Sequence, residues 1–155
     1  MKTFNDSAGR TWKLELTIAA AKRVKALTGT DLLALDQGDP PALTKLGLDV
    51  MLLCDVIFAV LQPQADAAGV SDEQFGESLG GEAILAARNA FFEELADFFR
   101  GLGRADLARA IAAQEKLVAA AVEQADRRIG RIDPRQIVGD PSMSLQASSA
   151  ATPAP

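Results

Sequence analysis

The chain has 155 residues, of which 48% are hydrophobic, and it contains one cysteine and no histidine or tyrosine. This size fits one domain with a single core, and the missing histidine excludes Ser-His-Asp and Cys-His catalysis. The net charge of −5 hides 13 acidic and two basic residues between positions 31 and 97, which argues against nucleic-acid binding.

The N-terminal segment, residues 1–16, alternates apolar and polar residues around a turn. Phe4 precedes the polar run at 5–10, and Trp12, Leu14 and Leu16 follow it with charged residues between them. Period-two alternation around a glycine-containing loop predicts a β-hairpin with one buried face. Because an isolated hairpin is only marginally stable, we expect it to pack on helices. The polar start also lacks the apolar core of a signal peptide.

Clear start and stop signals follow the hairpin. Thr17 can cap a helix through residues 18–27, and Gly29 can end it in a left-handed conformation. We expect one helical turn at 30–35, a loop at 36–41 and a short helix at 41–46. The clusters Lys22, Arg23, Lys25 and Arg127, Arg128, Arg131, Arg135 are interpreted as solvated helix faces.

The longest apolar run, residues 48–61, predicts the central buried helix. Asp49 and Asp55 interrupt it, and it is shorter than the roughly 20 residues that cross a bilayer, so we expect no membrane segment. The helix should end at Gln62 and Pro63, because proline cannot donate to the preceding turn. Cys54 lies within the run and is expected to be a buried, inert thiol, which suits the reducing cytoplasm.

A second helical region contains most of the aromatic residues. Ser71 and Gln74 have the spacing of a capping box, and the Gly80-Gly81 pair separates that short helix from a longer one at 82–100. Core burial is the usual explanation for an apolar stripe at helical spacing. Two adjoining stripes exceed what one buried side needs, so we interpret the surplus as a surface for a protein client or for self-association, formed by Phe91, Phe92, Leu95, Phe98 and Phe99.

The C-terminal region is predicted to contain a long helix and a tail. Apolar residues from Leu107 to Ile129 recur at helical intervals and form a narrow seam, suited to one partner helix within the core or in another subunit. After Pro134 the composition is rich in Ser, Ala and Pro, which predicts disorder. We therefore predict a mainly α fold: a single domain at 1–133, with the hairpin packed on five to six helices, and a disordered tail at 134–155.

Carboxylates are the remaining candidates for chemistry. The densest sets are Glu93, Glu94, Asp97 and Asp72, Glu73, Glu77. On amphipathic helices such groups are usually solvated, so we expect no catalytic site, no metal and no cofactor. A carboxylate enzyme that uses magnesium or manganese through Glu94 and Asp97 is the catalytic alternative.

Several segments together resemble a known family. The segments are AGRTW at 8–12, RVKALTGTDLL at 23–33, the run at 52–84 that starts LLCDVIFAVLQPQ, and FFEELADFF at 91–99. In this order they are similar to the small tail assembly chaperones encoded by tailed bacteriophages and prophages, over most of residues 1–130.

The resemblance implies a helical, non-catalytic protein of the bacterial cytoplasm. Such a protein binds the tape measure protein, or another apolar helical client, keeps it soluble while the tail tube assembles, and leaves before the virion is complete. A structural virion component, such as a connector or a tail completion protein, is the alternative and would persist in the particle.

Overall fold

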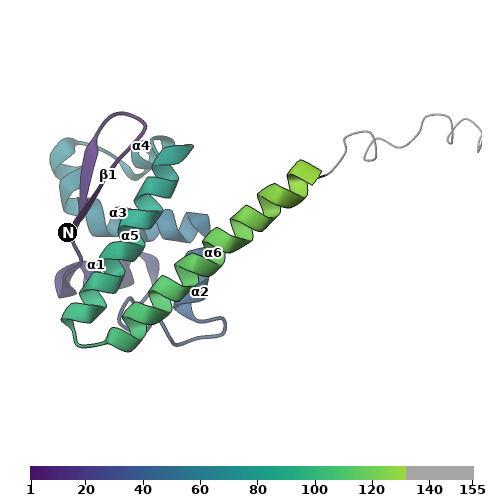
Figure 1. Cartoon of the computed structure of the whole chain (residues 1–155). Helices are drawn as coiled ribbons and strands as arrows, with labels where there is room; N and C mark the ends of the chain where they lie inside the picture. Colours follow the sequence, from purple (N-terminus) through teal and green to yellow (C-terminus); the bar gives the residue numbers. More distant parts are fainter. Residues whose placement is uncertain (132–155) are drawn as a thin grey trace, which may run out of the picture. The chain divides into compact units, whose positions relative to one another are not determined.

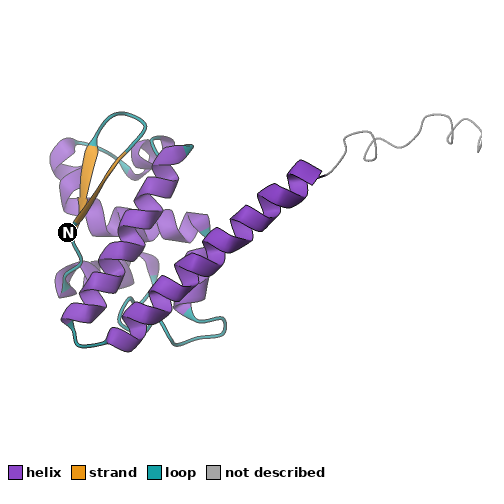
Figure 2. Cartoon of the chain, in the orientation of Figure 1, coloured by secondary structure: helices purple, strands orange, loops and turns teal. Residues whose placement is uncertain are grey.

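The computed structural model describes residues 1–131, which form a mainly helical fold with an N-terminal β-hairpin (Figures 1 and 2). The predicted fold class is confirmed. Contacts divide the described residues into one unit at 1–117 and another that begins at residue 118. The elements in order are β1 (Lys2–Asn5), β2 (Thr11–Leu14), α1 (Ile18–Thr28), α2 (Ala42–Leu48), α3 (Val50–Ala68), α4 (Asp72–Glu77), α5 (Glu82–Gly101) and α6 (Ala105–Arg131).

The hairpin forms as its alternation predicts, with β1 and β2 antiparallel and Phe4 paired with Trp12. Asp6 organises the turn: its Oδ1 accepts hydrogen bonds from the backbone N–H groups of Ala8 (3.0 Å) and Arg10 (2.9 Å). Its Oδ2 accepts from Arg10 Nε (2.8 Å) and Trp12 Nε1 (2.9 Å). Burial by itself would raise the pKa of Asp6, but the hydrogen bonds from Arg10 and Trp12 lower it to about 2.

The hairpin is held against the helices by its apolar face and by one glutamine. The ring of Trp12 meets Phe75 of α4 edge to face, with centroids 5.4 Å apart. Gln64 of α3 mimics a third strand, because its amide accepts from Lys13 N (3.1 Å) and donates to Lys13 O (2.5 Å). These contacts supply the partners that an isolated hairpin lacks.

Helix α1 begins and ends where its capping residues predict. The Thr17 side chain accepts from Ala20 N (3.1 Å), and Gly29 follows the helix with a φ of 77°. The predicted helical turn at 30–35 is wrong: this segment forms consecutive turns. Asp31 explains the difference, because its Oδ1 accepts from Leu33 N (2.9 Å), a local bond that competes with helix formation.

The predicted end of the central helix at Pro63 is also wrong. Helix α3 continues through Pro63 to Ala68, and Gly69 ends it with a φ of 67°. Proline leaves the carbonyl of Ala59 without its usual donor four residues later. Arg23 of α1 replaces that donor, with Nε 2.6 Å from Ala59 O and Nη2 2.9 Å from Val60 O. The helix continues because a neighbouring element satisfies the exposed carbonyl.

By composition alone, α3 fits either a membrane-spanning helix or the core helix of a folded domain. Its length and hydropathy are enough for a membrane span, yet core helices of folded domains meet the same criteria. Seven of its residues are buried in the core: Leu53, Val56, Ile57, Ala59, Val60, Leu61 and Ala65.

The capping box at the start of α4 forms as predicted, with the Ser71 side chain accepting from Gln74 N and the Gln74 side chain accepting from Ser71 N. Helix α5 then packs against both hairpin strands and α3. The first turns of α6 add Leu107, Ala108 and Ile111 to the same core. The domain boundary predicted at 133/134 and the predicted disordered tail at 134–155 lie outside the described residues.

Candidate protein-binding surface

The five side chains predicted to bind a client do not form an exposed surface. Phe91 is 0% exposed, Phe92 1%, Leu95 0% and Phe99 2%, and Phe98 is partly buried. The premise of that prediction, apolar area left over after the core is filled, therefore fails for four of the five. Their role in client binding remains a prediction for which this structure offers no accessible face.

The neighbours of α5 explain why so wide a face is buried. Both hairpin strands and α3 pack against α5, so most of its aromatic side chains find partners within the fold. The rings of Phe91 and Phe92 stack edge to face at 5.4 Å, and Phe98 and Phe99 do so at 5.6 Å. The Arg88 guanidinium lies 5.2 Å from the centroid of Phe92. The aromatic surplus is thus used inside the fold.

The carboxylates of α5 anchor the N-terminal strand. Glu94 is buried, and its Oε1 accepts from Leu16 N (3.0 Å) while its Oε2 lies 2.9 Å from the Met1 nitrogen. Lys2 pairs with Glu93 (3.7 Å) and Asp97 (3.4 Å). Within residues 1–131, no three acidic, cysteine or histidine side chains are grouped to hold a metal. The arrangement accounts for these groups as structural contacts.

Exposed apolar side chains gather instead where α2 meets α3. We call this surface the corner: Leu48, Val50 and Met51, with Pro40 beside them. Leu48 is 74% exposed, Val50 52% and Met51 80%. These three belong to the apolar run at 48–61, for which the sequence predicts a buried helix; that prediction is wrong for the first residues of the run.

Asp49 divides the apolar run at the corner. Its Oδ1 accepts from Leu52 N (3.0 Å) and caps α3, so the apolar run is divided between two helices. The first turn of α3 then begins at the surface. An aspartate directly before an apolar run is a recognised helix-start signal, and this signal at Asp49 predicts the break between α2 and α3 that the apolar run alone does not.

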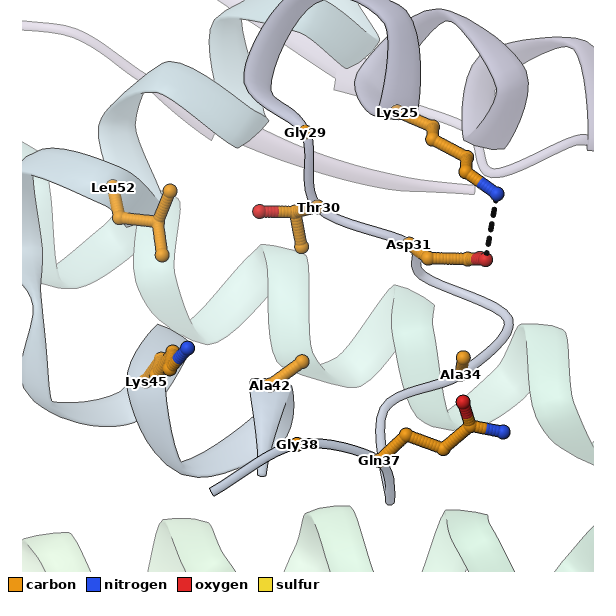
Figure 3. A pocket seen from close by; sticks show the side chains of 10 residues that line it. All are labelled: Lys25, Gly29, Thr30, Asp31, Ala34, Gln37, Gly38, Ala42, Lys45 and Leu52. Carbon is orange, nitrogen blue, oxygen red and sulfur yellow. Dashed lines mark hydrogen bonds and ion pairs between the residues drawn. The ribbon is translucent and has the colours of Figure 1, made fainter. Parts of the chain in front are cut away.

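A second hollow, of about 360 Å³, lies between α2 and the turns at 29–38 (Figure 3). Lys45 contributes to both surfaces, and Leu52 and Ala42 line the hollow together with the turns at 29–38. Lys25 and Asp31 form an ion pair of 3.2 Å at its rim. A hydrogen bond from Leu33 N, followed by that from Lys25, lowers the pKa of Asp31, so this carboxylate stays ionised and paired.

A third depression, between α1, α3 and the start of α4, is acidic. Leu27, Phe58, Asp55 and Asp72 line it. Burial, then the charges of Asp72 and Asp49, raises the pKa of Asp55. Burial also raises the pKa of the half-buried Cys54 thiol, with Asp55 and Asp72 adding to the shift, so Cys54 has little thiolate character.

Apolar side chains and a few charged groups line the three surfaces. In the basic cluster of α1, the Arg23 guanidinium is not free for a ligand, because it donates hydrogen bonds to two carbonyls of α3. No family model, curated protein or solved structure matches this chain.

Proposed function

We propose that this chain is a non-catalytic tail assembly chaperone of a tailed bacteriophage or prophage. It binds the tape measure protein in the bacterial cytoplasm, keeps it soluble during tube assembly and is absent from the finished particle. The single observation that supports a binding role is the corner, where Leu48, Val50 and Met51 expose apolar side chains on a folded unit. The family resemblance suggests which client this surface serves.

The chemistry of the corner suits reversible binding. Burial of apolar area contributes about 25 cal/mol per Å² before the cost of ordering both partners is subtracted. Three exposed side chains supply a modest contact, which allows release of the client to the growing tube. Several copies along one long client would raise the overall affinity by avidity.

Co-expression tests the proposal directly. The tape measure protein of the same genome is produced with and without this chain, and its soluble fraction is measured. We expect most of it to be insoluble alone and soluble with the chaperone. Equal solubility in the two cultures would overturn the proposed function.

Mass spectrometry of purified mature particles separates the chaperone from a structural virion component. We expect no peptides of this chain in the particle, since a chaperone leaves before completion. Stoichiometric recovery would instead favour the connector or tail completion role.

A further inference from the structure

We propose that the corner seats one amphipathic α-helix of the client, whose apolar face is flanked by lysine or arginine. This inference rests on the proposed function and names the surface that meets the client. Leu48, Val50 and Met51 come from the last residue of α2 and the first turn of α3, and together they line an open hollow of about 530 Å³. An apolar helix contributes side chains three and four residues apart to a surface of this kind.

The size of the corner favours a single helix over a second copy of this chain. A standard protein interface uses about 20–30 residues on each side. The corner offers three strongly exposed apolar side chains and one proline. One face of one helix can cover this area, whereas a stable symmetric dimer needs much more.

The charges around the corner favour a basic partner. Asp49 lines the hollow and is exposed, and Asp39, also exposed, directly precedes Pro40 in the chain. Lys45 is the single base that lines the hollow; with Asp49 in the lining and Asp39 next to Pro40, two acidic side chains face one basic side chain. A symmetric second copy would bring another acidic corner onto this one, and facing like charges disfavours association. Lysine or arginine beside the apolar face of a client helix has the complementary charge.

Peptide binding provides the test. The probe is a fluorescein-labelled helix of leucine and lysine, ~18 residues or five turns long, and its match has glutamate in place of lysine. Anisotropy is measured with the intact chain and with Met51→Glu, Leu48→Glu and Leu85→Glu. Leu85 is the matched control, because it is 59% exposed on α5 and does not line the corner.

We expect the lysine peptide to bind and the glutamate peptide to bind at least about tenfold more weakly. Met51→Glu and Leu48→Glu should each weaken binding of the lysine peptide by about tenfold or more, while Leu85→Glu should leave its affinity unchanged. Unaltered circular dichroism of the variants shows that binding, and not folding, has changed. Equal binding to Met51→Glu, or equal loss in Leu85→Glu, would overturn the proposal.

Two further outcomes identify other occupants or other sites. A dimer in sedimentation that Met51→Glu dissociates would make the occupant a second copy and would overturn the helix proposal. In the co-expression assay, a client kept soluble equally by the intact chain and by Met51→Glu would refute the corner and leave the proposed function standing. Failure of the intact chain itself would refute the proposed function instead.

Discussion

Helix α5 and the corner between α2 and α3 show opposite uses of apolar residues. Helix α5 carries the greatest concentration of aromatic side chains, yet four of its five predicted binding residues are at most 2% exposed. The corner lies in an aliphatic run that resembles core, yet Met51 is 80% exposed. The difference shows that exposure depends on which elements pack nearby more than on local apolar content.

The largest expected effect comes from the buried side of this comparison. Phe92→Ala and Phe99→Ala should each cost about 3–5 kcal/mol of unfolding free energy, because both rings fill the core. Urea denaturation measures this cost. Phe92→Asp should prevent stable folding altogether, since the carboxylate would have no partner in the core.

Leu85→Asp is the control for these variants on the same helix. Leu85 is 59% exposed, so its replacement should change stability by less than about 0.5 kcal/mol. A folded Phe92→Asp protein with unchanged stability would mean that the aromatic face is accessible after all, and would restore the original binding hypothesis.

A second prediction concerns the hairpin that covers α5. Asp6→Asn should destabilise the fold by about 2 kcal/mol at pH 7, because the amide N–H₂ would face the donors Arg10 Nε and Trp12 Nε1. The folded pKa of Asp6 is lowered from 3.8 to about 2, so its contribution is present above pH 3.8 and is lost as the pH falls toward 2.

Urea denaturation of both proteins at pH 7 and pH 2 tests this sign. The difference in unfolding free energy between the intact chain and Asp6→Asn should be smaller at pH 2, where the native carboxyl becomes protonated. If this difference in unfolding free energy were equal at the two pH values, the charge of Asp6 would make no contribution to stability.

A third prediction concerns the later, buried part of α3, where Pro63 lies inside the helix. Arg23→Met should cost about 1–2 kcal/mol, because the carbonyl of Ala59 loses the donor that replaces Pro63. Pro63→Ala supplies an N–H four residues after Ala59, so Arg23→Met should cost less in that background. A double-mutant cycle measured by thermal unfolding gives the coupling. Additive effects of the two substitutions would contradict the compensation.

The smallest expected effect on stability comes from the corner itself. Met51→Glu and Leu48→Glu should change the free energy of unfolding by less than about 0.5 kcal/mol, because both side chains already contact water. Thermal unfolding of the two corner variants and of Phe92→Ala, measured side by side, compares an exposed site with a core site. A loss of 2 kcal/mol or more at Met51, on the order of a core substitution, would place this side chain in the core.

Local patterns were enough to predict most elements. The alternation around Trp12 predicted the hairpin, Thr17 and Gly29 predicted both ends of α1, and Ser71 predicted the start of α4. These signals are local, because a cap or a turn is satisfied by atoms within a few residues of it. For the same reason the fold class could be stated from the sequence by itself.

Tertiary contacts decided where α3 ends and which apolar side chains are buried, and local sequence patterns could not predict either. Pro63 stays inside α3 because Arg23, forty residues earlier in the chain, donates to the freed carbonyl. Three phenylalanines of α5, Phe91, Phe92 and Phe99, are buried because the hairpin and α3 pack against this helix. Met51 is exposed because no described element covers it. Burial depends on the area that neighbours remove from water, and residues distant in sequence supply those neighbours.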